Sequence, residues 1–176
     1  VLSNLASITQ FALVLAIVDR RLLKPFVPSI GLGALITVVY GVLLLAPWRA
    51  TSGGPPAHRG DGAFSLWTAL IITVALTCIA LFSAFLLQHL GHNGVNIAAF
   101  VSGMGDAHAA IASVASLVIV GRLSVESLVI PGLLALSGNT LTKCILALTN
   151  GGFSFARYLV PGQLIILGAM WLGLVI

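Results

Sequence analysis

Long apolar stretches alternate with short polar connections along the whole chain. Six such stretches can be drawn, at about 1–18, 26–46, 64–88, 94–120, 126–148 and 155–176. Each has the roughly 17–25 residues that a helix needs to cross a hydrocarbon core about 30 Å thick. They are continuously apolar instead of alternating, which indicates helices and not the strands of a membrane barrel. The pattern predicts an all-α, polytopic transmembrane helical bundle of about six spans.

A polar connection divides this bundle. Residues 49–63 are rich in glycine and proline and hold no apolar run, which is typical of a flexible linker. We therefore expect three parts: a first transmembrane helical pair at 1–48, the linker at 49–63, and a four-helix transmembrane region at 64–176.

The composition indicates which environment surrounds this bundle. Hydrophobic residues make up 59% of the chain and charged residues 7%, whereas a soluble domain carries roughly 25% charged residues. The expected partner of the surface is therefore a lipid bilayer. The net charge of +4 contains no basic run, so we expect no nucleic-acid binding. The chain starts at Val1 and not at Met, from which we expect a piece of a longer protein, and no motif calls for a cofactor.

A faint internal repeat joins the two ends of the chain. A shift of 133 positions lays Thr9, Leu13, Leu15, Val27 and Pro28 on Thr142, Leu146, Leu148, Val160 and Pro161. Transporters are often built from such repeats. With six simple crossings the two copies would run in the same direction, and Arg157 would share a membrane side with Arg20 and Lys24. An inverted relation would require a broken or re-entrant segment.

Asp106 is an acidic residue near the centre of a long apolar stretch. A carboxyl at that depth costs roughly 2.5–3.5 kcal/mol on insertion scales, and such groups often mark an ion or proton path. Helical spacing places it on one stripe of small and polar residues, Ser102, Asp106, Ala109, Ser113 and Ser116. We expect this stripe to face another helix. Tight helix packing, with the serines bonded to carbonyls, is the plainer reading.

His108 lies two residues further, about 200° around an ideal helix, so it shares no face with Asp106 unless the helix breaks. Gly103 and Gly105 stand just before the pair and favour such a break, because glycine weakens helix interiors. Unwound backbone at membrane depth is one way to build an ion site. In a regular helix His108 would instead be a packing histidine.

A second polar group occurs in the fifth stretch. Asn139 and Lys143 are four residues apart and share a helical face, with Thr140 and Thr142 flanking it. Lys143 either reaches for the membrane interface or forms a buried partner for Asp106. The first stretch echoes this pattern, without a charge, in Asn4, Ser7, Thr9 and Gln10.

These observations predict a set of candidate ion- or proton-binding residues: Asp106, His108, Asn139, Thr140 and Lys143. Ser102, Ser113 and Thr142 would form a secondary polar lining, and Gly103 and Gly105 a hinge. No metal is assigned.

The string Gly103-Met104-Gly105-Asp106 also matches the Gly-x-Gly-Asp motif of intramembrane aspartyl proteases. That chemistry needs two carboxylates that share a proton. The other acids, Asp19, Asp61 and Glu126, fall at stretch ends or in connections. We therefore expect no enzyme and assign no catalytic residue, and the protease is kept as a third reading.

Two strings carry a family resemblance. The run from Gly105 to Leu117, GDAHAAIASVASL, and the run from Leu136 to Lys143, LSGNTLTK, resemble the domain of unknown function 4010 family. This is a membrane domain found C-terminal to MgtC/SapB-type segments in bacterial proteins. The resemblance implies a multipass protein of the bacterial inner membrane, loosely associated with divalent cation or other ion handling, without a defined substrate.

The leading interpretation is a transporter or channel-like protein for a small ion, divalent or coupled to protons, with Asp106 at its site. The alternative is a regulatory or scaffold membrane subunit in which the polar residues lock helices together. The fourth stretch carries small residues on more than one face, and Ala112 and Ala115 are expected to be free for a second helix contact. This favours a homodimer.

Overall fold

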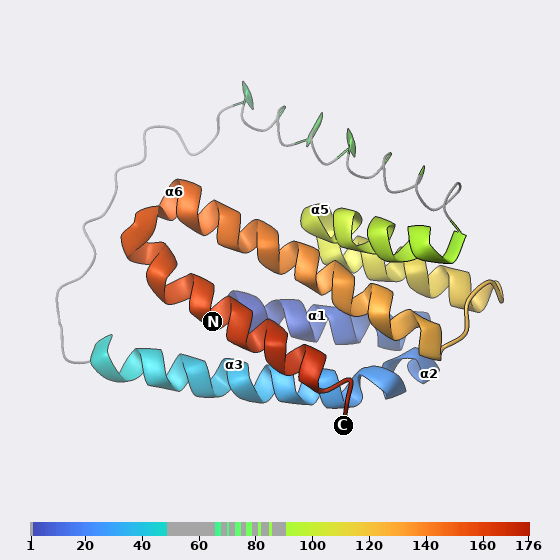
Figure 1. The fold of residues 1–176 in the computed structure, drawn as a ribbon, viewed down its shortest axis with the longest axis horizontal. Coiled ribbons are helices and arrows are strands. Elements are labelled where there is room, and N and C mark those ends of the chain that lie inside the picture. Colours follow the sequence, from blue (N-terminus) through green and yellow to red (C-terminus); the bar gives the residue numbers. More distant parts are fainter. Residues whose placement is uncertain are drawn as a thin grey trace.

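The computed structural model describes residues 2–48 and 91–176, with residues 66, 67, 70, 73, 74, 77, 78, 81 and 85 between them. Its helices, in chain order, are α1 (Leu2–Val18), α2 (Arg20–Leu23), η1 (Lys24–Phe26), α3 (Val27–Trp48), α5 (Gly91–Ile119), η2 (Glu126–Leu128) and α6 (Val129–Leu172) (Figure 1). No strand occurs in this part of the chain, and the all-α prediction is confirmed. The predicted linker at 49–63 lies outside the described residues, as does most of the predicted span at 64–88.

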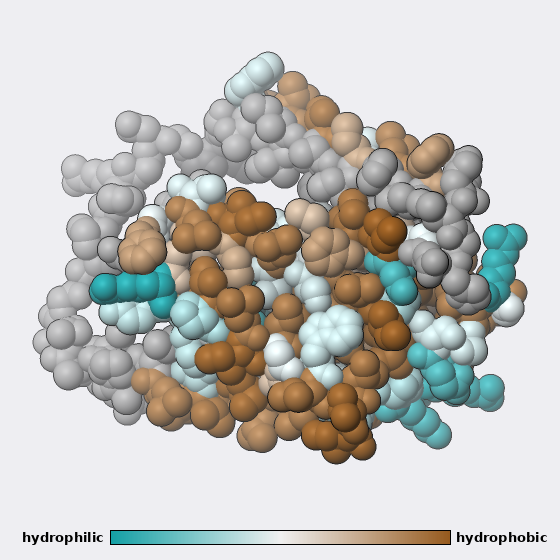
Figure 2. All heavy atoms as spheres, viewed as in Figure 1, coloured by the Kyte–Doolittle hydropathy of each residue, from teal (hydrophilic) through white to brown (hydrophobic). Residues whose placement is uncertain are grey.

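The helices have the length and the surface of membrane spans. Four helical stretches are long and apolar enough to cross a bilayer, Arg20–Leu43, Gly94–Ile119, Glu126–Thr149 and Phe155–Leu172, and Ser3–Val18 is a shorter apolar helix. Large apolar side chains such as Ile17, Leu43 and Leu164 stand exposed, and brown apolar atoms dominate the visible face (Figure 2). A surface of this kind needs lipid around it. The six predicted spans are not confirmed, since four candidates occur among the described residues.

A buried core ties α1 to α5 and α6. Phe11 of α1 meets Phe26 edge to face, with ring centroids 5.3 Å apart, and Ile111 and Leu133 are fully buried beside them. Gly132 makes room for the Phe26 ring, because a Cβ there would come within 2.7 Å of it. The core therefore lies where α5 and α6 cross α1.

Helix α6 consists of two arms that meet at Gly152. Its backbone there has φ 68° and ψ 171°, and the positive φ favours glycine, which has no Cβ. The first arm (residues 129–151) and the second arm (residues 153–172) run side by side as a hairpin (Figure 1). They correspond to the two separate stretches predicted at 126–148 and 155–176.

Helix α5 also breaks, at Asp106, whose backbone is extended with φ −153° and ψ 107°. Both ends of α5 lie at the same end of the molecule in Figure 1, and its halves, residues 91–105 and 107–119, meet at an apex away from that end. Each half is shorter than the roughly 20 residues that a crossing requires. By length and composition α5 resembles one span, but the break at Asp106 folds it into a helical hairpin in place of the predicted continuous helix.

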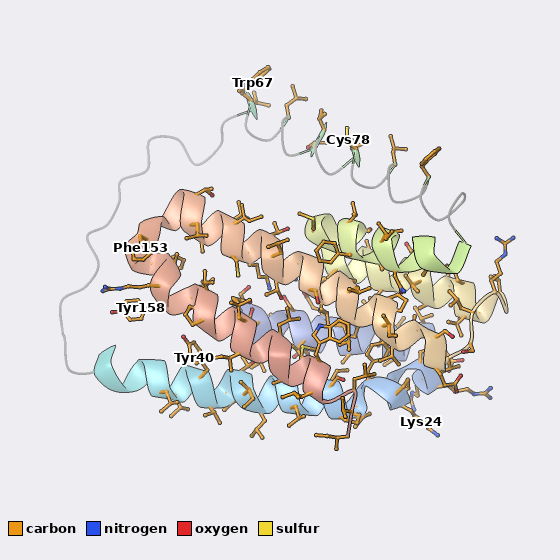
Figure 3. All side chains as sticks on the ribbon, viewed as in Figure 1. Lys24, Tyr40, Trp67, Cys78, Phe153 and Tyr158 are labelled. Carbon is orange, nitrogen blue, oxygen red and sulfur yellow. The ribbon has the colours of Figure 1, made fainter. Side chains whose placement is uncertain are left out.

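The direction of the helices follows from this turn. Helix α1 runs opposite to the first arm of α6, and α3 runs opposite to the second arm (Figure 1). Lys24 therefore lies at one end of the molecule, and Phe153 and Tyr158 lie towards the other (Figure 3). The expectation that the two similar segments run the same way, with Arg157 on the side of Lys24, is wrong. It assumed that α5 crosses the membrane once.

Candidate functional site

The apex of α5 is built by the side chain of Asp106. Its Oδ1 accepts the backbone N–H groups of His108 at 2.8 Å and Ala109 at 3.3 Å. Together with the extended backbone, these bonds are those of a helix N-cap, which satisfies amide groups that the preceding turn no longer reaches. The break predicted near Gly103 and Gly105 therefore occurs one residue later, and Asp106 begins the second half of the helix.

Thr142 completes this apex from the first arm of α6. In an unbroken helix the N–H of His108 would donate to the carbonyl of Met104, but here it donates to Asp106. The Thr142 hydroxyl donates to the Met104 carbonyl at 2.9 Å, and the Gly138 carbonyl lies 3.2 Å from the same oxygen. Thr142, predicted as part of a polar lining, thus supplies the donor that the helix break removes.

Two glycines allow α5 and α6 to approach this closely. A Cβ on Gly103 would collide with the backbone of Ala135, and one on Gly138 with the carbonyl of Phe100. Gly103, predicted as a hinge, is thus a point of backbone contact between helices.

The carboxylate of Asp106 does not form the predicted pair with Lys143. Asp106 is exposed, and no ion pair joins it to Lys143, whose amine bonds elsewhere. The stripe predicted to face another helix is exposed at Asp106, Ala109, Ser113 and Ser116, and its serine hydroxyls donate to carbonyls of their own helix. The pair prediction failed because the N–H groups at the break take up the carboxylate.

His108 is half-buried on the second half of α5. Its Nδ1 is buried and has no hydrogen-bond partner within the described part of the chain. The side chain bonds neither to Asp106 nor to any of the other predicted site residues. Ser102 is likewise half-buried on the first half of α5.

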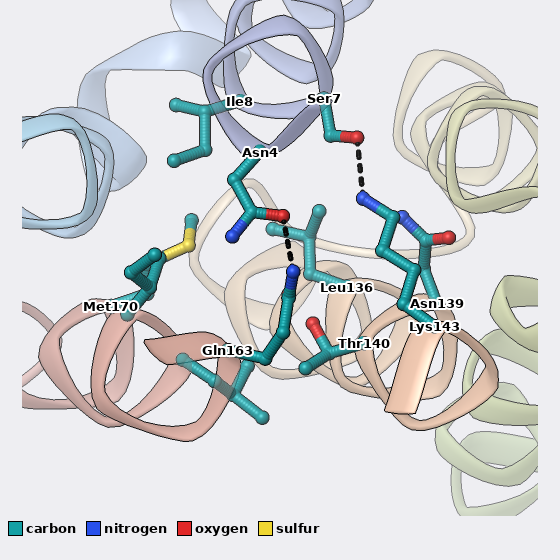
Figure 4. Close-up of a pocket in the computed structure, with 11 residues that line it drawn as sticks. Asn4, Ser7, Ile8, Leu136, Asn139, Thr140, Lys143, Gln163 and Met170 are labelled. Atoms are coloured by element: carbon teal, nitrogen blue, oxygen red, sulfur yellow. Dashed lines mark hydrogen bonds between the residues drawn. The ribbon is translucent and has the colours of Figure 1, made fainter. Parts of the chain in front are cut away.

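The polar residues of the fifth stretch do converge, on a pocket between α1 and the two arms of α6 (Figure 4). Its wall consists of Asn4, Ser7, Ile8, Leu136, Asn139, Thr140, Lys143, Gln163, Ile166, Leu167 and Met170. The cavity volume is about 20 Å³, which is room for one water molecule. Three predicted site residues, Asn139, Thr140 and Lys143, are thus brought together.

Lys143 crosses this pocket. Its Nζ donates to the Ser7 hydroxyl of α1 at 2.9 Å, and the side chain is half-buried (Figure 4). The ammonium is therefore held between helices, neither snorkelling to the interface nor paired with Asp106. Ser7 belongs to the polar echo noted in the first stretch.

Beside it, the Gln163 side-chain amide donates to Asn4 Oδ1 at 2.9 Å, and both residues are buried (Figure 4). This bond joins α1 to the second arm of α6. Sequence reasoning missed Gln163. The signal available was a lone amide in an otherwise apolar last stretch, directly after Pro161 and Gly162.

The lining of the pocket carries a basic group and no acidic one. Its lining includes one basic residue and no Asp or Glu. Among the residues that the structure describes, no group of three or more His, Cys, Asp or Glu side chains could hold a metal ion. The arrangement offers hydrogen-bond donors and a positive charge, which are the groups that bind an anion or a polar oxygen.

Comparison with known proteins gives a family but no relative of described function. The chain belongs to the family described as Domain of unknown function (DUF4010), whose sequence profile matches residues 1–151. This confirms the resemblance drawn from the Asp106 and Lys143 strings. No curated protein and no solved structure matches the chain.

Proposed function

We propose that this member of the DUF4010 family is a transporter or channel-like protein for a small ion, with the Lys143 pocket as its site. The observation that carries the proposal is the half-buried ammonium of Lys143, bonded to Ser7 across the helix bundle in a pocket without an acid. Charged groups inside membrane helices are costly, face the bundle interior and mark ion pathways. The site thus moves from Asp106, where the sequence placed it, to Lys143.

The arrangement of the helices supports transport. The 133-residue shift carries Asp19, where α1 has ended, onto Gly152, where α6 turns. It also carries Ser29 onto Gly162 and Tyr40 onto Gly173.

Both contacts between these positions are present. Tyr40 packs on Gly162, and Ser29 packs on Gly173. Each contact is the image of the other, as a pseudo-two-fold axis between the two hairpins requires. Because the hairpins run in opposite directions (Figure 1), we propose that they are the two halves of an inverted repeat. Inverted repeats are common in secondary transporters, which bind substrate at the repeat interface.

The pocket occupies that interface. Asn4 and Ser7 come from the first hairpin, and Asn139, Lys143 and Gln163 from the second. The re-entrant α5 adds a broken helix beside it, another feature of transporter sites.

Flux measurements test the function. Purified protein in liposomes is expected to carry an ion current or tracer flux that Lys143→Gln reduces and Lys24→Gln, at an exposed lysine outside the pocket, leaves unchanged. Absence of flux for all small anions and cations in the wild-type protein would refute transport. Equal flux in wild type and Lys143→Gln would show that the Lys143 pocket is not the transport site.

The inverted arrangement has its own test. Single cysteines replacing Arg20 and Arg157 in a background without Cys78 and Cys144 are expected to react with a membrane-impermeant maleimide from opposite sides. Labelling of both cysteines from the same side would contradict the inverted arrangement and support six simple membrane crossings. We propose the bacterial inner membrane as the native membrane for this experiment.

A regulatory or scaffold subunit is the second candidate, favoured by the structural use of Asp106 and Thr142 at the helix break. In that role the polar groups position helices for a partner, and a second copy of the chain is one candidate. Ala115 is fully buried inside the chain and so cannot be part of a dimer contact, contrary to expectation, whereas the exposed side of α5 at Ser113 and Ser116 remains available. Mass measurement in nanodiscs across a concentration series tests self-association.

A further inference from the structure

We infer that the Lys143 pocket binds a small monovalent anion, and that such an anion is the ion carried. The inference rests on the proposed transport function and names its substrate class. It departs from the cation expected from Asp106.

The charge of the pocket favours an anion. The Lys143 ammonium lies among residues of which none is acidic, and its Nζ donates to the neutral Ser7 hydroxyl. A charge taken out of water needs a counter-charge or loses its proton. A bound anion supplies the counter-charge. A cation at about 4 Å would instead be disfavoured roughly a thousandfold at an effective dielectric constant of 20.

The pocket also offers hydrogen-bond donors to an anion. An ammonium has three N–H donors, and one of them is used on Ser7. Gln163 gives one amide N–H to Asn4, which leaves its second N–H and the amide of Asn4. The Asn139 amide and the Thr140 hydroxyl also line the wall. Neutral N–H and O–H donors around one cation are suited to a desolvated anion.

The size of the cavity favours a small ion. A cavity of about 20 Å³ admits one water molecule or a particle of similar size. A halide fits this description, whereas a multi-atom organic anion requires the helices to separate. Chloride is therefore the probe of choice, with gluconate as the anion that the pocket excludes.

The test uses the full chain in liposomes loaded with chloride, with potassium and proton fluxes followed in parallel. We expect chloride efflux that exceeds gluconate efflux. Lys143→Gln is expected to lower chloride efflux by at least about tenfold, because one charge interaction in a partly buried site is lost. Lys143→Arg keeps the charge and is expected to retain anion selectivity, and Lys24→Gln serves as the control. Thermal unfolding of each variant in detergent shows that it folds.

The outcomes separate the two claims. Potassium or proton flux that depends on Lys143, without chloride flux, overturns the anion inference and keeps transport. Proton flux alone would assign Lys143 as a proton carrier. Absence of every flux overturns both.

A binding measurement supports the same decision without transport. Chloride added to protein in gluconate buffer is expected to raise the unfolding temperature of the wild type and of Lys24→Gln, and not that of Lys143→Gln. An equal rise in all three would place the anion elsewhere.

Discussion

The apex of α5 and the Lys143 pocket are both polar interruptions of apolar helices, yet they use their polar groups in different ways. At the apex, Asp106 bonds to amides two and three residues away in the sequence. In the pocket, Lys143 and Gln163 bond to partners 136 and 159 residues away. The first set of bonds repairs a helix break. The second joins separate helices around a cavity.

The contrast teaches where charge is available for function. The carboxylate of Asp106 already serves two N–H groups, so it stabilises the backbone where it stands. The ammonium of Lys143 keeps donor capacity that its bond to Ser7 does not use. A rare charged residue in a membrane helix therefore does not by itself identify the functional site. The hydrogen bonds that the residue makes show whether its charge is available to a ligand.

Alanine at Gly103 or Gly138 is expected to cause the largest change. A Cβ at either position collides with backbone atoms of the facing helix, and overpacking of this kind costs about 1–3 kcal/mol or more. Gly168→Ala is the matched control, since nothing lies within 4 Å of its Cβ position. Thermal unfolding in detergent measures both. If Gly103→Ala unfolds at the wild-type temperature, the close contact of α5 with α6 is wrong.

Thr142→Val is expected to cause the next largest loss of stability. The substitution keeps the shape and removes the hydroxyl that bonds to the Met104 carbonyl. A fully buried carbonyl left without a donor costs about 1–3 kcal/mol, and this part-buried one should cost up to that amount. Thr149→Val is the comparison on the same arm, because the Thr149 hydroxyl bonds only to carbonyls of its own helix and its loss should be nearly neutral. Equal unfolding temperatures for the two variants would contradict the bracing role of Thr142.

Substitutions at Asp106 separate its cap from its charge. Asp106→Ala is expected to lower stability by about 0.5–2 kcal/mol, the usual cost of a lost N-cap, whereas asparagine caps about as well as aspartate. Asp19, which caps α2 through Arg21 N–H at 2.8 Å, gives the same pair of substitutions at a different helix start. If a folded Asp106→Asn protein has lost ion flux, Asp106 takes part in transport, and the contrast drawn between the α5 apex and the Lys143 pocket is wrong.

Ser7→Ala should change stability least. The variant loses the hydroxyl bonded to Lys143, but a water molecule in the adjoining cavity can replace it, so the change should stay below about 1 kcal/mol. Anion flux is expected to change all the same, because the ammonium is no longer held by α1. Ser3→Ala, at an exposed position of the same helix, should alter neither quantity. A large loss of stability would make the Ser7 bond structural.

Much of the architecture could be read from local pattern. Apolar periodicity and length gave α1, α3 and the two arms of α6 to within a few residues, because a bilayer imposes one length on any crossing helix. Gly103 and Gly105 indicated a break in α5 within one residue of its place. The pocket was half predicted, through Asn139, Thr140 and Lys143, because helical spacing puts polar residues of one arm on one face.

The sequence by itself determined the solvent, the helical class, the family and the polar residues worth attention, since each depends on composition or on neighbours within a turn or two. Only the tertiary structure decided which polar groups meet. It turned α5 back at Asp106, which reversed the second hairpin and brought Gln163 to Asn4 and Lys143 to Ser7. Those pairings depend on the direction in which distant helices run, and no local spacing encodes that direction.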